Sequence, residues 1–189
     1  NVNHELRTPL TNVLGALRTI NARHGEEPAV ETGLRNASRL LVMLNDLLEL
    51  SRIDSGRGMA HTRTIDLGTL IRGVARDFQA DVNERLRVDP SCSHALLYAN
   101  VDPKQIRTVL YNLLGNAFKF SRSNSPPVEL SVASNESEVA ITVRDHGIGI
   151  AEERLEQIFE RFYRIEAGQY QHHEGVGIGL SLVREIVER

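Results

Sequence analysis

A histidine beside a carboxylate, His4 followed by Glu5, is the first feature of the sequence that could do chemistry. Neutral imidazole is abundant at pH 7 and nucleophilic, and a neighbouring carboxylate can accept or orient its ring proton. The surrounding apolar residues are spaced by four and three, which predicts a helix with a narrow apolar seam. His4 falls outside that seam and should face solvent, beside a bend at Pro9. The alternative is a solvated histidine without a role.

Two amides and an amine share one face of a second expected helix, residues 103–120. At about 100° per residue, Asn112, Asn116 and Lys119 fall within roughly 60° of one another, nearly opposite the apolar face. Amide oxygens suit Mg²⁺, which also binds phosphate oxygens, and a lysine one turn away can neutralise a phosphate. The alternative is an ordinary solvated polar face.

A carboxylate and two glycines follow an expected strand. Apolar and polar residues alternate over 139–143, so Asp145 should end the apolar face of that strand. A carboxylate at the end of a buried face needs a partner, and the amino group of adenine would be one. Gly147 and Gly149 would let the backbone approach such a ligand closely.

A second glycine run, Gly175, Gly177 and Gly179, precedes the last expected helix. Backbone amides at a helix N-terminus can hold a phosphate. The spacing differs from the dinucleotide fingerprint G-x-G-x-x-G, and the sequence contains no P-loop motif. The run therefore indicates a phosphate site at a helix N-terminus that belongs to neither of these two motifs.

Two apolar stripes with heptad spacing predict two helices, the first of which carries His4. A polar break at 22–29 joins them. Two such helices form an antiparallel hairpin, which buries little by itself. A second copy would cover the seam by forming a four-helix bundle, and the alternative is packing against the rest of the same chain. The stripes are Leu6, Leu10, Val13, Leu17 and Ile20, then Val30, Leu34, Ala37, Leu41, Leu44 and Leu48.

After the second stripe the pattern changes to mixed strands and helices without regular βαβ alternation. This mixture favours an α+β sandwich with helices on one face of a sheet. Asp102 can cap the 103–120 helix, and Pro103 fits its first turn. Strands are expected near 61–65, 85–89, 95–100, 128–132 and 139–143, and further helices at 67–80, at 152–158 and from 179.

Composition limits the classes of function. The 189 residues are 41% hydrophobic and 25% charged, with a net charge of -3, which gives no basic surplus for nucleic acid. No run reaches the ~20 apolar residues that span a bilayer. The single cysteine, Cys92, excludes a disulfide framework and a cysteine-based zinc site. We expect a cytoplasmic segment without membrane contact, although a longer protein could carry an anchor.

The segment from His4 to Leu10, His-Glu-Leu-Arg-Thr-Pro-Leu, resembles the phosphoacceptor box of bacterial sensor histidine kinases. Four further segments resemble boxes of the same family and occur in the family's order. Together they cover nearly the whole chain. They are the N box at 112–121, the G1 box at 145–150, the F box at 158–164 and the G2 box at 175–180.

The resemblance implies a role for each matched residue. His4 would be phosphorylated, with Glu5 as the acid/base helper, and Thr8 would position water when the same domain dephosphorylates its partner. Asn116 would coordinate Mg²⁺, with Asn112 close to the metal or the phosphates. The nucleotide would be bound by Lys119, Asp145, Gly147, Gly149, Phe159, Gly175, Gly177, Gly179 and Leu180, together with the two asparagines.

The resemblance therefore implies a histidine kinase core. Residues 1–54 would form the dimeric hairpin, 55–58 a linker and 59–189 a Bergerat-type ATP-binding sandwich. ATP with Mg²⁺ would phosphorylate His4, and an aspartate of a response regulator would accept the phosphoryl group. Because the family adds a further strand pair, we expect the chain to be a fragment of a longer sensor protein that lacks its C-terminal strands.

Two other classes of function are compatible with parts of the sequence. One is a kinase-like regulatory module that forms a heterodimer with another sensor kinase and does not transfer phosphate. The other is a chaperone or clamp ATPase of the same superfamily. Such an ATPase would lack the box around His4 and would carry a catalytic glutamate where this chain has Asn112.

Overall fold

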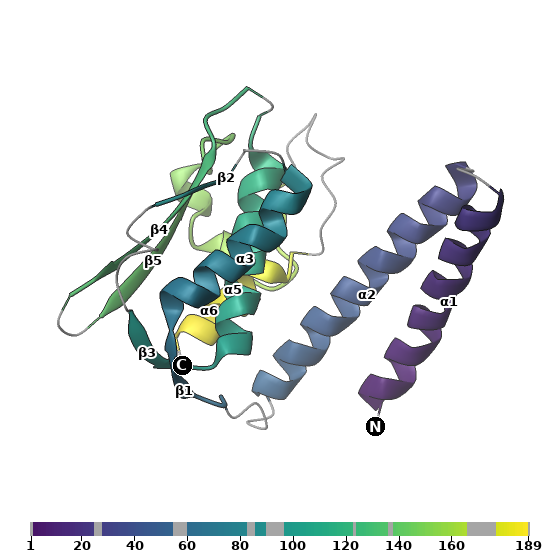
Figure 1. Ribbon diagram of the computed structural model, residues 1–189, viewed down its shortest axis with the longest axis horizontal. Helices are drawn as coiled ribbons and strands as arrows, with labels where there is room; N and C mark the ends of the chain where they lie inside the picture. Colours follow the sequence, from purple (N-terminus) through teal and green to yellow (C-terminus); the bar gives the residue numbers. More distant parts are fainter. Residues whose placement is uncertain are drawn as a thin grey trace. The chain divides into compact units, whose positions relative to one another are not determined.

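The computed structural model describes the backbone of residues 2–24, 28–54, 60–82, 86–89, 97–122, 124–135, 138–165 and 177–188 (Figure 1). Side chains of residues 2–9, and of several other positions in the helices, are outside the description. The chain divides into two compact units, Asn1–Gly58 and Met59–Arg189. Within the described ranges, no helix is both long enough and apolar enough to cross a membrane.

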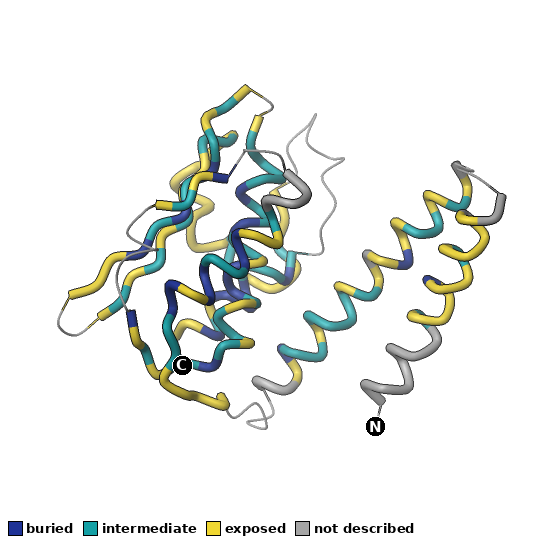
Figure 2. Tube along the Cα trace, viewed as in Figure 1, coloured by how far each residue is buried: buried dark blue, intermediate teal, exposed yellow. Residues whose placement is uncertain are grey.

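The first unit is a helical hairpin of α1 (Val2–His24) and α2 (Pro28–Asp54), which pack against each other. Gly33 allows close packing, since a Cβ there would lie 3.3 Å from a methyl carbon of Leu17. Few side chains are buried along either helix (Figure 2). The predicted pair of helices is confirmed.

Burial along α1 follows a slightly different line from the predicted stripe. Leu14, which lies outside the stripe, is buried, whereas Val13 and Ile20, which belong to it, are 50% and 43% exposed. Adjacent helical positions differ by about 100°, so the face that α2 covers is rotated relative to the heptad stripe. The single hairpin therefore leaves part of the apolar stripe in solvent.

The second unit combines short strands with helices and 3₁₀ turns (Figure 1). Its two sheets are the antiparallel pair β1–β3 and a three-stranded sheet in which β4 pairs in parallel with β2 and antiparallel with β5. The elements are β1 (Arg63–Asp66), α3 (Leu67–Val82), β2 (Leu86–Val88), β3 (Tyr98–Val101), α5 (Pro103–Phe120), β4 (Val128–Ser134), β5 (Val139–Arg144), the 3₁₀ turns η1 (Glu152–Arg154) and η2 (Gln157–Phe159), and α6 (Gly179–Val187).

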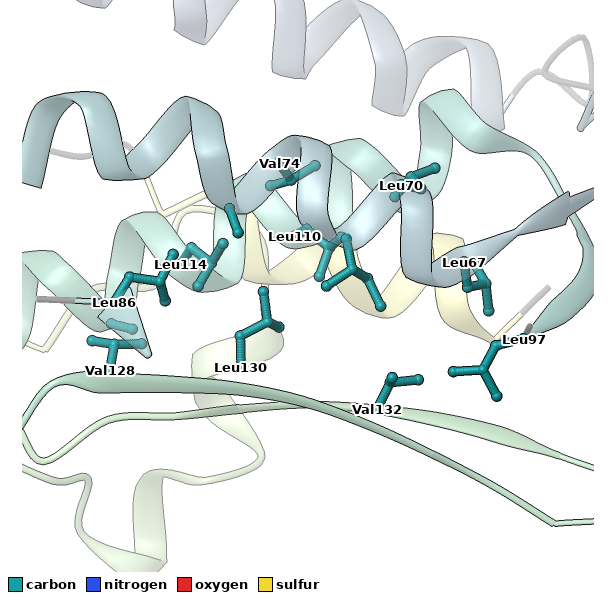
Figure 3. Packing of buried hydrophobic residues seen from close by; sticks show 13 residues of the cluster. Leu67, Leu70, Val74, Leu86, Leu97, Leu110, Leu114, Val128, Leu130 and Val132 are labelled. Atoms are coloured by element: carbon teal, nitrogen blue, oxygen red, sulfur yellow. The ribbon is translucent and has the colours of Figure 1, made fainter. Parts of the chain in front are cut away.

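The core of the second unit lies between the helices and the sheet. Figure 3 shows α3 and α5 over one face of β4 and β5, with apolar side chains filling the space between them. Leu114 and Leu130, from opposite layers, are completely buried. The core cluster is Leu67, Leu70, Ile71, Val74, Ala75, Leu86, Leu97, Leu110, Leu114, Ala117, Val128, Leu130 and Val132. The predicted α+β sandwich is confirmed.

Local signals set the ends of α5 where the sequence placed them. Oδ1 of Asp102 accepts hydrogen bonds from the backbone N–H groups of Lys104 (2.8 Å) and Gln105 (3.4 Å), and Pro103 occupies the first turn.

The expected helix at 152–158 is wrong, because this segment forms the two separate turns η1 and η2. Packing of η2 against α6 sets its path more strongly than helix propensity does.

Candidate functional site

Helix α5 carries three of the predicted site residues. Asn112, Asn116 and Lys119 are half-buried on one of its faces, while Leu110 and Leu114 are buried in the core on another. The side-chain amide N–H of Asn112 donates to the carbonyl of Thr108 at 2.9 Å. This hydrogen bond fixes the amide plane, so the carbonyl oxygen of Asn112 is held in one orientation.

The first residue of α6, Gly179, lies directly against Asn112. A Cβ at Gly179 would collide with Oδ1 of Asn112 and would stand 3.2 Å from its amide carbon. Glycine therefore allows the N-terminus of α6 to approach α5 this closely without displacing the Asn112 side chain. The N-terminal backbone amides of α6 are thereby placed beside the Asn112 side chain, with Leu180 half-buried in the same turn.

The segment after β5 lies against the C-terminal end of α5. A Cβ at Gly147 would stand 2.5 Å from the backbone carbonyl oxygen of Phe120, the last residue of α5. The backbone N–H of Gly147 also donates to Oδ1 of Asp145 at 2.8 Å. The two glycine segments therefore reach the asparagine helix at two different points. We regard this convergence as the geometric definition of the site.

Asp145 is more accessible than the sequence predicted. The side chain is exposed, and the apolar residues that precede it on its face of β5 are only half-buried. The preceding residues on this face, Val139, Ile141 and Val143, do pack against the core cluster, but the expectation that Asp145 itself is buried there is wrong, because Asp145 lies just beyond the end of β5 and is exposed. The carboxylate is turned back toward the glycine segment by its hydrogen bond with Gly147, which leaves its second oxygen available to a ligand.

Among the described residues of the glycine segments, Gly149 (φ 72°) and Gly177 (φ 76°) have left-handed backbone. Gly177 is also packed tightly, since a Cβ there would stand 2.5 Å from the carbonyl oxygen of Tyr163. Its carbonyl accepts a hydrogen bond from Phe162 N–H at 2.8 Å, and Phe162 itself has a φ of 67°. A non-glycine residue rarely adopts this conformation, so the contact fixes the F-box segment next to the N-terminus of α6.

Charged and aromatic side chains join the F-box segment to α6. The guanidinium of Arg184 lies 5.7 Å from the ring centre of Phe159 and 3.7 Å from the carboxylate of Glu156. Its hydrogen bond with Glu188, together with the charges of Glu188 and Glu156, raises the pKa of Arg184. Tyr163 joins the same segment internally, because its hydroxyl donates to Gln157 at 2.7 Å and accepts from Arg154 at 3.0 Å.

The donor chemistry of this face fits a nucleotide with a hard divalent cation. The amides of Asn112 and Asn116 are one turn apart, and Mg²⁺ accepts one or two protein oxygens beside waters and phosphate oxygens. Nζ of Lys119 lies 4.8 Å from the ring centre of Phe120, one turn beyond Asn116. Within the described residues, no group of three or more histidine, cysteine, aspartate or glutamate side chains could hold a metal ion.

Some predicted site residues are outside the described part of the chain. The backbone of His4, Glu5 and Thr8 belongs to α1, but their side chains are not described, and Gly175 lies in a segment that is not described at all. Sequence reasoning also missed the structural reason for two glycines. It assigned Gly147 to close approach of a ligand and Gly179 to a phosphate site at a helix N-terminus, whereas each of them also permits contact with α5. No local signal in the sequence could have revealed these tertiary contacts.

Two family models match the chain. Residues 1–56 match the His Kinase A (phospho-acceptor) domain, and residues 101–189 match the histidine kinase-, DNA gyrase B- and HSP90-like ATPase. The sensor histidine kinase TmoS of Ectopseudomonas mendocina is 36% identical over 99% of this chain, which is 20% of TmoS. The autoinducer 2 sensor kinase/phosphatase LuxQ of Vibrio cholerae is 34% identical over 99% of this chain and 23% of its own length.

Solved structures agree with these matches. The crystal structure of full-length ShkA in complex with AMPPNP has a TM-score of 0.74 and 25% identity, covering 99% of this chain and 39% of ShkA. The catalytic domain of histidine kinase ThkA has a TM-score of 0.56 and 26% identity, covering 68% of this chain and 80% of that structure. The chain belongs to the sensor histidine kinases and contains the phosphoacceptor and ATP-binding domains of that family. It spans about a fifth of the length of the curated relative TmoS.

Proposed function

We propose that the chain is a catalytic core that transfers the γ-phosphoryl group of ATP to His4. The observation that carries this proposal is that two glycine segments pack against α5, Gly179 against Asn112 and Gly147 against the backbone of Phe120. These contacts hold backbone from two glycine segments against the helix that carries Asn112 and Asn116, which supports an ATP-binding site on this helix. The AMPPNP bound to the similar protein ShkA supports the same nucleotide class.

The predicted site residues would each contribute to binding ATP. The exposed carboxylate of Asp145 accepts a hydrogen bond from the adenine amino group. Asn116 supplies an amide oxygen to Mg²⁺, Asn112 orients the nearby turn of α6, and Lys119 neutralises phosphate charge. The ring of Phe159 and the backbone amides of Gly177, Gly179 and Leu180 border the phosphates, and Gly149 and Gly175 belong to the same two glycine segments. Mg²⁺, when bound, offsets the charge of the β- and γ-phosphates.

His4 acts as the nucleophile. A ring nitrogen of neutral imidazole forms a bond to the γ-phosphorus while the bond from that phosphorus to the bridging oxygen breaks, and ADP leaves with that electron pair. Glu5 takes or orients the proton of the imidazole as positive charge develops on the ring. An aspartate of a response regulator then accepts the phosphoryl group. In a separate reaction, when the same domain dephosphorylates the regulator, Thr8 positions the water that attacks the phosphorus of the aspartyl phosphate, and inorganic phosphate leaves.

Residues 1–54, which include His4, would form a homodimer. On α1, Val13 and Ile20 are seven residues apart and exposed, and on α2 the same is true of Leu40 and Leu47. Heptad-spaced apolar residues that a single hairpin leaves exposed are suited to a second copy in a four-helix bundle. We therefore propose a homodimer. No observation favours the alternative of a regulatory module paired with another sensor kinase.

The test is incubation of the chain with γ-labelled ATP and Mg²⁺, alongside His4→Gln and the matched control His24→Gln. We expect label on the protein that is stable in base and labile in acid, absent from His4→Gln and from samples with the metal chelated, and retained in His24→Gln. Asn116→Ala should lose label together with nucleotide affinity. Label that persists in His4→Gln, or its absence from a chain that binds ATP, contradicts the proposal. Adding a receiver domain should then remove the label from His4.

A further inference from the structure

Asp102 is a buried carboxylate that binds two separate parts of the chain. The residue is only 9% exposed and caps α5, with Oδ1 accepting from the backbone amides of Lys104 and Gln105. Its other oxygen, Oδ2, accepts a hydrogen bond from the backbone N–H of His61 at 2.8 Å. A helix cap needs only the first two contacts, so the third requires a separate explanation.

His61 lies where the chain enters the second unit. Two residues later, Arg63 begins the antiparallel ladder of β1 with β3 and pairs with Val101, the residue before Asp102. This register brings the start of the unit and the start of α5 to the same place, although they are 41 residues apart in sequence. The Asp102 carboxylate then binds the backbone N–H of His61, two residues before the first pair of the ladder.

The electrostatics show that the contact is made to an ionised group. Burial opposes ionisation, but the hydrogen bonds from His61, Lys104 and Gln105 outweigh it, with a further contribution from the charge of His61. The pKa of Asp102 is therefore below its usual range. Hydrogen bonds to a charged acceptor are roughly twice as strong as those between neutral groups. A backbone amide bound in this way is firmly held.

We propose that Asp102 is a positioning residue that clamps the segment joining the two units to the first turn of the helix carrying Asn112 and Asn116. This inference rests on the proposed phosphoryl transfer to His4. With the clamp closed, the joining segment ends at His61. With the clamp open it ends at the β1 ladder, which lengthens the tether by up to about 7 Å for two residues. A longer tether lowers the effective concentration of the γ-phosphate at His4 and makes its orientation less well defined.

Three single variants separate the clamp from the helix cap. Asp102→Ser keeps a short side chain that caps α5 but cannot reach His61. His61→Pro removes the donor N–H without changing α5. His61→Ala keeps the N–H and is the matched control for loss of the imidazole. Circular dichroism should show wild-type helix content in all three.

We expect Asp102→Ser and His61→Pro each to slow autophosphorylation at saturating ATP by about threefold or more, since the clamp acts on the transfer step. The Kd for AMPPNP should stay within about twofold, because the clamp lies outside the nucleotide contacts. His61→Ala should match the wild type. The double variant Asp102→Ser with His61→Pro should be no slower than either single variant, since both remove one interaction. Additive losses, or a loss in Asp102→Ser alone, would overturn the proposal.

Amide hydrogen exchange gives a readout that does not depend on kinase activity. We expect the His61 amide to be protected in the wild type and in His61→Ala, and to exchange at least about tenfold faster in Asp102→Ser. Equal exchange in wild type and Asp102→Ser would show that no clamp exists. If the wild type is not labelled at His4 but its His61 amide is protected, the proposed function fails while the clamp itself stands.

Discussion

The two units of the chain reach stability by different means. The helical hairpin buries Leu14, Ala37 and Leu50 and leaves apolar side chains such as Leu40 in solvent. The second unit buries a continuous cluster between helices and sheet and adds aromatic contacts, in which the ring centre of Phe78 lies 5.2 Å from that of Tyr111 and 5.6 Å from that of Phe118. The hairpin therefore depends on further contacts, whereas the ATP-binding unit contains its own core.

The two units also differ in their aromatic content, which makes the comparison measurable. All four tyrosines and all five phenylalanines follow residue 59, and the chain contains no tryptophan. Tyrosine fluorescence therefore reports on the ATP-binding unit alone, while circular dichroism at the helix band reports on both units. Each variant below can be assigned to one unit by whether both signals change or only one.

The largest expected effect concerns the incomplete core of the hairpin. The double variant Leu40→Asn with Leu47→Asn places amides at two exposed, heptad-spaced positions of α2, which are 54% and 41% exposed in the single chain. We expect the dimer to weaken by about fiftyfold, roughly 2.3 kcal/mol, because several apolar side chains lose their cover. Sedimentation equilibrium should show a shift from two chains to one.

The matched control for this variant is Ser38→Asn, which adds the same amide at an exposed polar position of α2. It should leave the association unchanged. Tyrosine fluorescence and AMPPNP affinity should be unaltered in both variants, because the ATP-binding unit has its own core. A monomeric wild type, or a double variant that remains fully dimeric, would refute a homodimer through this face.

The next effect concerns contacts that the sequence did not reveal. We expect Gly179→Ala to lower AMPPNP affinity by about tenfold, roughly 1.4 kcal/mol, since the added Cβ collides with Oδ1 of Asn112 and separates α6 from α5. Titration calorimetry measures the affinity directly. Gly115→Ala is the control, because a Cβ at Gly115 meets nothing within 4 Å and the substitution favours the helix. Equal losses in both variants would show that the contact does not matter.

These contacts mark the limit of what could be predicted from the sequence. The bounds of α5 follow from local signals, since Asp102 and Pro103 define its start and its apolar spacing defines its buried face. The approach of Gly147 to Phe120 joins segments that are distant in the chain, and no local pattern encodes it. The burial expected for Asp145 failed for a different reason. Alternation along β5 predicts correctly which side chains share the face toward the core, but Asp145 follows the last residue of the strand, where that cover has ended.

The smallest effect contrasts one carboxylate in each unit. Burial raises the pKa of Asp46, on α2, from 3.8 to about 6. The folded hairpin therefore binds this proton more tightly than the unfolded chain does, and its stability falls as pH rises through that window. Asp102 behaves in the opposite way. Its pKa is lowered, so its contribution is complete above the ordinary carboxyl pKa and is lost as pH falls through the lowered value.

Asp46→Asn should consequently stabilise the hairpin at pH 7.5 by about 1 kcal/mol, after allowance for the partial exposure of the carboxyl group, and should have little effect near pH 4. Urea unfolding followed by circular dichroism at both pH values measures the change, with tyrosine fluorescence as an internal reference that should not move. Asp102→Asn is the contrasting control, because it should destabilise the ATP-binding unit at pH 7.5 and change the fluorescence transition. An equal gain from Asp46→Asn at both pH values would mean that local packing, rather than the buried charge, sets the stability of α2 at this position.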